Sequence, residues 1–153
     1  MGERRRSTGT FDVRRTTGSD EVVDRLFAYA TLRQGQSARS LIANQVTRCV
    51  KASAPGAIYA FPMGYVGFVE ASEETIEPRH VVGELLWLTE LPAMFGLLDA
   101  YEGPDFARVL IQAKLETGEL IWSWIYALAD TEAIKHGTLI EHGDWVRYLA
   151  ERG

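Results

Sequence analysis

The stretch that decides the fold runs from residue 26 to residue 36 and reads Leu26-Phe27-Ala28-Tyr29-Ala30-Thr31-Leu32-Arg33-Gln34-Gly35-Gln36. Its first half is a short apolar and aromatic run of the kind that forms a buried strand. The run then breaks at small and hydroxyl residues, so we expect a strand over 24–32 that ends in a tight turn. Backbone N–H groups that lose their ladder partners at such a turn can point together at an anion. The turn is therefore a candidate pocket floor, and the alternative is an ordinary strand end.

The whole chain has the composition of an ordinary globular domain. It has 153 residues, of which 46% are hydrophobic and 24% charged, and its net charge is −5. A chain of this length buries roughly two-thirds of its unfolded surface, so its core needs no metal or disulfide. The acidic balance argues against nucleic-acid binding. No apolar run approaches the roughly 18 residues of a membrane span, which argues against a membrane protein.

Residues 1–24 differ in composition from the rest of the chain. They are rich in Arg, Thr, Ser and Gly and contain few large apolar residues. Such a segment buries too little apolar surface to fold, which favours a flexible leader followed by a single domain over 25–153. The N-terminal arginines are not followed by the apolar run of a signal peptide, and the single cysteine, Cys49, cannot form an internal disulfide. A reducing cytoplasm is the expected location.

The order of the expected elements favours an α+β fold. We expect a strand over 24–32, a short helix over 37–44, and strands over 46–60 joined by a turn at Pro55-Gly56. An aromatic segment over 57–65 is core or pocket wall, and a strand follows over 81–88. A helix then begins at an N-cap Thr89 and ends at Gly103, a hairpin spans 108–127, and the last segment, 140–150, is a closing helix or a turn plus a helix. Strands recur around short helices without regular βαβ alternation. We therefore expect a small mixed, largely antiparallel β-barrel with flanking short helices.

The end of the helix before Gly103 carries the second chemically interesting feature. Leu98 and Tyr101 are three residues apart and are expected to share the buried side, and Glu102 is turned toward the same face. A helix C-terminus repels a negative charge, and partial burial disfavours the charge further. Both effects raise the pKa of Glu102, which is the direction that a general base near neutral pH needs. The alternative is a Glu102 that faces solvent just before a glycine cap.

These two features together resemble a known pair of motifs. Tyr29-Ala30-Thr31-Leu32-Arg33-Gln34-Gly35 resembles the Tyr-Gly-Thr-Leu-Arg-x-Gly signature of the gamma-glutamylcyclotransferase-like family, which includes the AIG2-like proteins. Leu98-Asp99-Ala100-Tyr101-Glu102-Gly103 resembles that family's Leu-Asp-x-x-Glu-Gly segment. Weaker resemblances lie at 82–85, 124–126 and 140–145. The resemblance covers about residues 25–150 in the family's order.

The resemblance implies a small barrel with a pocket between the strand-end turn and the acidic helix. It also implies cleavage of a gamma-glutamyl amide, in which the substrate's own α-amine attacks the γ-carbonyl and releases 5-oxoproline with an amine or amino acid. Glu102 would be the general acid/base, and backbone N–H groups of residues 29–32 would hold the α-carboxylate and the developing oxyanion. No metal or organic cofactor is implied. The expected partner is a small gamma-glutamyl molecule bound by a monomer or weak homodimer.

The candidate substrate-binding residues lie at the turn and on one late strand. They are Tyr29, Ala30, Thr31, Leu32, Arg33 and Tyr126. Arg33 is either a ligand for a substrate carboxylate or a plain surface charge. Trp122, Trp124 and Tyr126 alternate along a strand and share one face, which we expect to line the barrel interior.

Two positions depart from the family's pattern. Ala30 stands where the family usually has Gly, and Phe106 stands where many relatives have Tyr. If position 30 needs a positive φ, Ala costs roughly 1–2 kcal/mol, and even at a negative φ its methyl occupies space that a ligand's carboxylate approaches. A binding module on the same fold without turnover is therefore the alternative to an enzyme. A less favoured alternative is a protein-interaction domain with the Arg-rich leader as its docking arm.

The remaining polar residues have ordinary structural explanations. His80, His136 and His142 are too far apart in sequence to form a recognisable metal set. Cys49 has no nearby base, so an idle thiol is favoured over a nucleophile. Glu84 either flanks the pocket or faces solvent from its strand.

Overall fold

Strand β1 (Arg25–Ala28) lies inside the sheet, between two partner strands. It pairs antiparallel with β4 (His80–Leu88) and parallel with β6 (Leu120–Leu128). The strand ends earlier than expected because the chain turns after Ala28, and local hydrogen bonds such as Arg33 N to Ala30 O (3.1 Å) hold the turn. The computed structural model describes residues 23–71 and 79–152.

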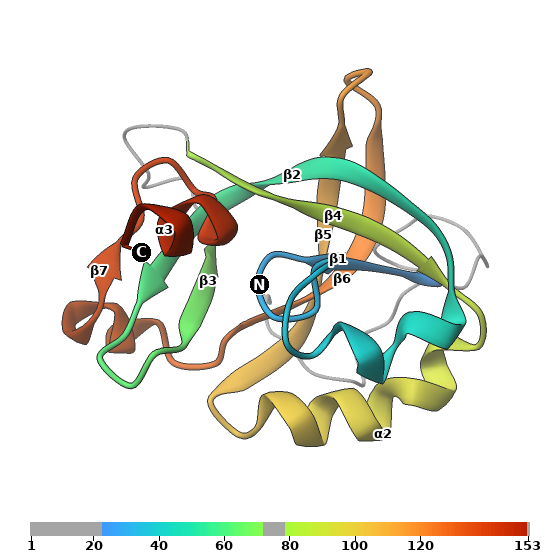
Figure 1. Cartoon of the computed structure of the whole chain (residues 1–153), viewed down its shortest axis with the longest axis horizontal. Coiled ribbons are helices and arrows are strands. Elements are labelled where there is room, and N and C mark those ends of the chain that lie inside the picture. Colours follow the sequence, from blue (N-terminus) through green and yellow to red (C-terminus); the bar gives the residue numbers. More distant parts are fainter. Residues whose placement is uncertain (1–22, 72–78, 153) are drawn as a thin grey trace, which may run out of the picture.

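Five strands close into a barrel around the core. Strands β2 (Val46–Ala60), β4, β1, β6 and β5 (Phe106–Leu115) follow one another, and β5 pairs back with β2. Among the described strands only β1 and β6 pair in parallel. Two further strands, β3 (Val66–Glu70) and β7 (Thr138–Leu139), pair with the second half of β2, which arches across the molecule (Figure 1). The predicted mixed, largely antiparallel barrel is confirmed.

Strand β2 is one continuous element where the sequence predicts two strands and a turn. Its residues up to Pro55 pair with β4, and those from Gly56 onward pair with β3. The Gly56 N–H donates to the Arg79 carbonyl (2.9 Å), and a side chain at Gly56 would strike the carbonyl of Val69 and the ring of Phe68. The prediction of a turn at Pro55-Gly56 is wrong because the pair marks the place where the strand changes partners.

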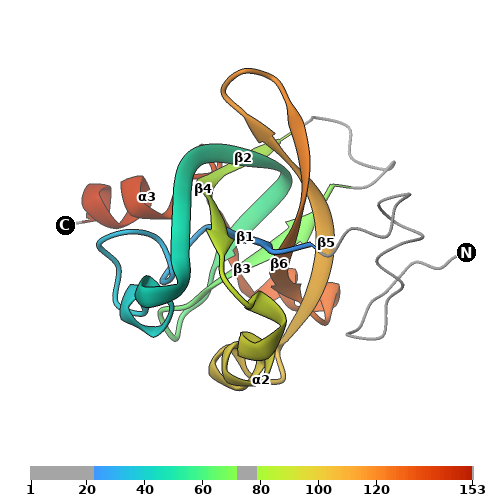
Figure 2. The ribbon, with the colours of Figure 1, turned by 90° about the vertical axis from the view of Figure 1, so that its right-hand side faces the viewer.

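Helix α2 (Leu91–Glu102) covers one end of the barrel, and the β5–β6 hairpin projects from the opposite end (Figure 1, Figure 2). The helix begins after Glu90, whose φ of 52° is left-handed, and no side chain caps it. Thr89 is therefore not the N-cap that the sequence predicts. The helix ends as expected at Gly103, whose φ of 85° is a conformation that glycine adopts at little cost.

The other helices are short. The helix expected over 37–44 is replaced by two 3₁₀ turns, η1 (Arg39–Leu41) and η2 (Ala43–Gln45). A third 3₁₀ helix, η3 (Thr131–His136), follows β6. The closing segment is a turn followed by helix α3 (Trp145–Arg152), which is one of the two expected forms, and strand β7 lies directly before it.

Apolar side chains pack in two layers on either side of the barrel wall. Successive residues along a strand point to opposite sides of the sheet, so each strand contributes side chains to both layers. The inner layer contains buried residues from all five barrel strands, including Phe27, Ala54, Leu85, Ile111 and Ile125. The outer layer joins the barrel wall to α2 and includes Leu26, Leu86, Trp124, Tyr126 and the helix residues Leu91 and Leu98.

The aromatic face of β6 belongs to the outer layer. Trp124 and Tyr126 are buried there, and Trp122 packs against it. The prediction that these three residues line the barrel interior is therefore wrong. Strand alternation put them on one face as expected, but the interior side is taken by Ile125 and Ala127.

The folded domain begins before residue 25. Val23 is 1% exposed, and its carbonyl accepts a hydrogen bond from Trp124 Nε1 (3.2 Å). Asp24 accepts one from Leu88 N (3.0 Å). Residues 1–22, the rest of the expected leader, lie outside the described residues. No helix within 23–71 and 79–152 has the length and apolar character needed to cross a membrane.

Candidate active site

A cavity of about 260 Å³ opens where β1 ends, beside the C-terminal end of α2. It is lined by Phe27, Ala28, Tyr29, Ala30, Thr31, Leu32, Gly64, Tyr65, Val66, Tyr101, Glu102, Phe106, Tyr126 and Trp145. The structure thus brings the turn over 29–32 together with Glu102 and Tyr126. Arg33 does not line the cavity. Both alternatives for the aromatic segment over 57–65 hold in part, because Gly64 and Tyr65 line the cavity and Ile58 is buried in the core.

Glu102 supplies the acidic group of the cavity. Burial raises the pKa of Glu102 to about 7. Its carboxylate makes no hydrogen bond or ion pair with another residue in the described part of the chain. A carboxyl group with a pKa near neutrality is half ionised at the pH of a cell, so it can both accept and donate a proton.

Residues 29–32, which we call the cradle turn, contain carbonyl groups that accept hydrogen bonds and N–H groups that have no partner among the described residues. The Ala30 carbonyl accepts from Arg33 N (3.1 Å), and the Thr31 carbonyl accepts from Ala38 N (2.9 Å). The N–H groups of Ala30, Thr31 and Leu32 donate to no other residue within 23–71 and 79–152. Because backbone N–H groups near a buried site normally have partners, these three are candidate donors to an anionic ligand.

Ala30 fits its place in the cradle turn without backbone strain. Glu90 is the one non-glycine residue with a positive φ among the residues described, so Ala30 has a negative φ. Its side chain packs against the inner core layer. The strain that a positive φ would have caused is therefore absent, and the remaining consequence of Ala in place of Gly is the methyl group beside the cavity.

Tyr29 anchors the cradle turn to β6. Its hydroxyl donates to the Tyr126 carbonyl (2.7 Å), and the side chain is 6% exposed. Burial, followed by the nearby negative charge of Glu102, raises the pKa of Tyr29 well above its usual value. The hydroxyl therefore keeps its proton and remains a donor.

Thr31 and Tyr101 join the two sides of the cavity. Thr31 Oγ1 and the Tyr101 hydroxyl lie 2.8 Å apart and form a hydrogen bond. Tyr101 is 43% exposed, so the prediction that it shares the buried side of α2 with Leu98 is wrong. Its ring borders the cavity instead, where it connects the helix that carries Glu102 to the cradle turn.

Asp99 fixes the last turn of α2 against the barrel. Arg108 donates to both carboxylate oxygens (Nε to Oδ1, 3.1 Å; Nη2 to Oδ2, 3.2 Å), and the Tyr126 hydroxyl donates to Oδ1 (2.5 Å). Burial alone would raise the pKa of Asp99, but the hydrogen bonds from Arg108 and Tyr126 outweigh it and hold the pKa below its usual value. The Arg108 guanidinium also lies 3.7 Å from the ring centre of Phe95. This network holds the helix turn that carries Glu102.

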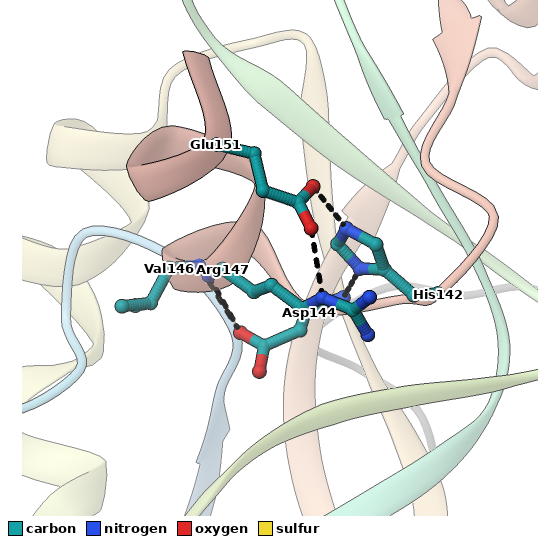
Figure 3. A network of polar contacts seen from close by, with 5 residues as sticks. All are labelled: His142, Asp144, Val146, Arg147 and Glu151. Carbon is teal, nitrogen blue, oxygen red and sulfur yellow. Dashed lines mark hydrogen bonds and ion pairs between the residues drawn. The ribbon is translucent and has the colours of Figure 1, made fainter. Parts of the chain in front are cut away.

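Arg33 forms an ion pair instead of bordering the cavity. Its Nη1 lies 2.9 Å from Asp144 Oδ1, and the two side chains are 13% and 25% exposed. The same Asp144 oxygen accepts from the N–H groups of Val146 (3.1 Å) and Arg147 (3.2 Å), which caps α3 (Figure 3). Burial alone would raise the pKa of Asp144, but the hydrogen bonds from Arg33 and the helix N–H groups lower it. Arg33 therefore ties the chain after the cradle turn to α3.

His142 belongs to a second polar group at α3. Its Nδ1 accepts from Asp144 N (3.2 Å), and its Nε2 lies 3.0 Å from Glu151 Oε1 (Figure 3). An accepting Nδ1 requires the imidazole proton on Nε2, which then donates to Glu151. Glu151 also accepts from Arg147 Nε (2.9 Å). His142 therefore has a structural role at the start of α3.

Glu84 braces the loop after the cradle turn. Its Oε1 accepts from Gln34 N (2.9 Å) and from Arg39 Nη1 (2.9 Å). Its side chain is 16% exposed, so neither expected position describes it: it faces neither the cavity nor open solvent. The loop is therefore held by carboxylates from two distant segments, Glu84 in β4 and Asp144 before α3.

Sequence reasoning missed several residues of the site. Trp145 is a buried core residue that also lines the cavity. Asp99 belongs to a quoted motif, but nothing in the sequence indicates its partner Arg108. Within the described residues no group of three or more His, Cys, Asp or Glu side chains is arranged to hold a metal ion, and Cys49 is exposed outside the cavity.

The structure is a closed five-stranded barrel with a cavity in which a carboxyl group lies beside a strand-end turn. Residues 26–147 match the family described as gamma-glutamyl cyclotransferase, AIG2-like, and the chain belongs to this family. The resemblance to this family, which the sequence shows in two short motifs, is therefore confirmed over most of the chain. No match was found among curated proteins.

Several solved structures share the fold. YkqA from Bacillus subtilis has a TM-score of 0.65 and 19% identity, over 86% of this chain and 44% of YkqA, so this chain spans less than half of that protein. The uropathogenic E. coli-specific protein c4763 has a TM-score of 0.64 and 18% identity, over 85% of this chain and 98% of that chain. An AIG2-like protein from Mus musculus has a TM-score of 0.50 and 19% identity, over 82% and 89%. At these identities the likeness concerns the fold.

Proposed function

We propose that the protein is a gamma-glutamylcyclotransferase that releases 5-oxoproline from a gamma-glutamyl amide or amine. One observation carries the proposal: a partner-free Glu102 with a pKa of about 7 lines the same cavity as the cradle turn and its free N–H groups. Family membership supports the same reaction. In this proposal Glu102 is the general acid/base, and Tyr29, Ala30, Thr31, Leu32 and Tyr126 bind the glutamyl group. Arg33 acts as a positioning residue through Asp144.

The reaction needs little more than positioning and proton transfer. Glu102 takes a proton from the α-ammonium, and the free α-amine attacks the γ-carbonyl carbon. The ring C–N bond forms, and the N–H groups of the cradle turn stabilise the oxyanion. The C–N bond to the leaving nitrogen then breaks as protonated Glu102 donates a proton to that nitrogen. The ring nitrogen still carries one proton more than a lactam holds, and it loses this proton to the released amine, which leaves as an ammonium ion. Because ring closure is intramolecular, a site that holds the glutamyl group in its folded rotamer gains much of the rate enhancement from this positioning alone.

An NMR titration with concurrent product detection tests the proposal. The isotope-labelled protein is titrated with gamma-glutamyl dipeptides and gamma-glutamyl-lysine while free 5-oxoproline is monitored. We expect shifts of the amide signals of residues 29–32 and of the Glu102 region, together with 5-oxoproline release. Localised shifts without product would leave a binding protein. The absence of both would mean that the cavity takes a different ligand.

The pH dependence of kcat/KM should reflect Glu102. Because the carboxylate form is the base that the first step needs, we expect kcat/KM to rise with pH along a limb with an apparent pKa of about 7. Well below this pH, the rate should fall about tenfold per pH unit. Initial rates between about pH 5 and pH 9 measure the profile. A flat profile across that range would contradict the assignment of Glu102.

The methyl group of Ala30 favours the alternative of a binding module, because it lies at the cradle turn where a substrate carboxylate would bind. Ala30→Gly is expected to raise kcat/KM about threefold to tenfold by opening this space. The change should lower the free energy of unfolding by only about 0.5–1 kcal/mol, since Gly is more flexible. Ala129→Gly, at an exposed position outside the cavity, is the control for added flexibility. Lower activity in Ala30→Gly would mean that the methyl group aids binding.

We further propose that the enzyme acts in the cytoplasm on small molecules, as a monomer or weak homodimer, without binding nucleic acid or membranes. The net charge of −5 and the single cysteine support this proposal.

A further inference from the structure

Arg108 brings a positive charge close to the cavity. It lies directly opposite Tyr126 in the β5–β6 ladder, and Tyr126 lines the cavity together with Glu102. Phe106 also lines the cavity, two residues before Arg108 and therefore on the same face of β5. In the described part of the chain no residue that lines the cavity is Arg, Lys or His. Arg108 is thus next to the cavity without lining it.

The guanidinium of Arg108 is buried and held by aromatic rings. Its side chain is 11% exposed. The guanidinium carbon lies 3.7 Å from the ring centre of Phe95 and 5.2 Å from that of Trp124. Cation–π contacts keep an Arg side chain in place, but a buried charge also needs an acidic partner.

Asp99 supplies this partner from α2. Its two carboxylate oxygens accept from Arg108 Nε (3.1 Å) and Nη2 (3.2 Å). Asp99 precedes Glu102 by three residues, and side chains at this spacing are neighbours on a helix, with Cβ atoms about 5–6 Å apart. The Asp99 carbonyl also accepts from Gly103 N (2.9 Å). The ion pair is therefore fixed at the helix turn that carries Glu102, where its two charges cancel.

Either charge of the pair would act on Glu102 if it stood alone. A positive charge stabilises a carboxylate and lowers its pKa, whereas a second negative charge raises it. Tyr126 is close enough to feel all three groups: burial and Asp99 raise its pKa, Arg108 lowers it, and Glu102 raises it. The ion pair thus lies within electrostatic range of the cavity.

The other titratable side chains that line the cavity with Glu102 are phenols. They are Tyr29, Tyr65, Tyr101 and Tyr126. Because a phenol is ordinarily neutral near pH 7, these side chains add no charge beside Glu102. The balance between Asp99 and Arg108 therefore determines the charge that Glu102 experiences from its own helix turn and from β5.

We propose that Asp99 is a positioning residue of the site, which holds the last turn of α2 and cancels the charge of Arg108 beside Glu102. This role rests on the proposed function, in which Glu102 must both accept and donate a proton. With the pair intact, burial determines the protonation of Glu102. With one partner removed, the charge that remains shifts it.

An NMR pH titration of the full chain, labelled at the glutamate carboxyl carbons, tests the proposal. The signal of Glu102 is assigned by its absence from Glu102→Gln. In Asp99→Asn the rings still hold Arg108, so its uncancelled charge should lower the pKa of Glu102 from about 7 in the parent. Arg108→Met leaves Asp99 unpaired and should raise the pKa. Because Asp99 is 47% exposed and water screens its charge, we expect each shift to be about 0.5–1 pH unit.

The double variant Asp99→Asn/Arg108→Met removes both charges and should return the pKa of Glu102 close to the parental value. Asp99→Glu keeps the charge and should do the same. The matched control is Arg147→Met, which removes the cation that lies 2.9 Å from Glu151 on α3, outside the cavity, and should leave the pKa of Glu102 unchanged. If Asp99→Asn does not fold, the direction of the shift in Arg108→Met decides.

The outcomes separate this proposal from the proposed function. Opposite shifts in the two single variants, reversed in the double variant, would support the charge balance, and the acidic limb of kcat/KM should move in the same directions. Shifts of the same sign, or none, would overturn the proposal even if the protein releases 5-oxoproline. If the shifts are opposite but the parent releases no 5-oxoproline, the charge balance holds and the cyclotransferase function fails.

Discussion

Replacing Glu102 with Gln is expected to lower kcat/KM for 5-oxoproline release about 10²–10⁴-fold. Gln has nearly the shape of Glu, but it can neither take a proton from the α-ammonium nor return one to the leaving nitrogen. Because the Glu102 carboxylate has no partner among the described residues, the substitution leaves no protein group unpaired. Most of the loss should appear in kcat, since the cradle turn that binds the glutamyl group is unchanged.

The stability of the same variant distinguishes lost catalysis from lost folding. Burial raises the pKa of Glu102 from 4.5 to about 7, so the folded state binds more protons than the unfolded state between these values. The free energy of unfolding of the parent should therefore fall as pH rises through this window, by up to about 3 kcal/mol. The Glu102→Gln variant has no carboxyl group to ionise at this position, so its free energy of unfolding should not fall in this window. It should therefore be more stable than the parent at pH 8.

Urea denaturation of the parent and Glu102→Gln at pH 5 and pH 8, beside the activity assay, provides the measurement. Glu116→Gln removes an exposed carboxylate from the β5–β6 turn and should leave activity at the parental level. An active Glu102→Gln protein would exclude Glu102 as the acid/base. A variant that is inactive and also less stable at pH 8 would point to a structural role for the carboxylate.

The sequence predicted the parts of the fold that local patterns determine. The apolar run at 26–28 is a buried strand, Gly103 ends α2 with a positive φ, and the Thr117-Gly118 turn joins a hairpin. These features depend on neighbouring residues, so a single sequence contains their signal. Pro55-Gly56 was misjudged because the same pair that marks a turn also allows a strand to change partners, and only the pairing of β3 and β4 distinguishes the two cases.

The candidate site was predictable where two motifs converge and not where distant segments meet. The cradle turn and Glu102 were found because a strand end and a helix end each carry a recognisable pattern. Trp145 and the Asp99–Arg108 pair depend on contacts between segments far apart in the chain. The same limit explains the assignment of Trp124 and Tyr126: alternation puts them on one face, but the position of α2 decides that this face is the outer one.

Asp144→Ala is expected to lower the free energy of unfolding by about 2–4 kcal/mol. Loss of the cap on α3 accounts for about 1 kcal/mol, because the N–H groups of Val146 and Arg147 lose their acceptor. The rest comes from Arg33, whose side chain is 13% exposed and would lose its charged partner, at a cost of about 1–3 kcal/mol. Urea denaturation near neutral pH measures the change.

Two matched variants separate the cap from the ion pair. Asp144→Asn keeps a good capping side chain and removes the charge, so it should cost less than Asp144→Ala. Asp130→Ala removes the acceptor of Glu132 N at the exposed start of η3, where no ion pair is involved, and should cost about 1 kcal/mol or less. An equal cost for Asp144→Ala and Asp130→Ala would mean that the pair with Arg33 contributes nothing.

Variants of Arg33 distinguish the two roles considered for this residue, which are positioning of the cradle turn and binding of a substrate carboxylate. Arg33→Met keeps the length of the side chain and removes its charge. If Arg33 positions the cradle turn through Asp144, the double variant with Asp144→Asn should show a coupling energy of about 1–3 kcal/mol, and kcat/KM should fall together with stability. If Arg33 instead binds a substrate carboxylate, KM should rise while the free energy of unfolding stays at the parental value. The geometry favours the first result, because the guanidinium lies 2.9 Å from Asp144 and does not border the cavity.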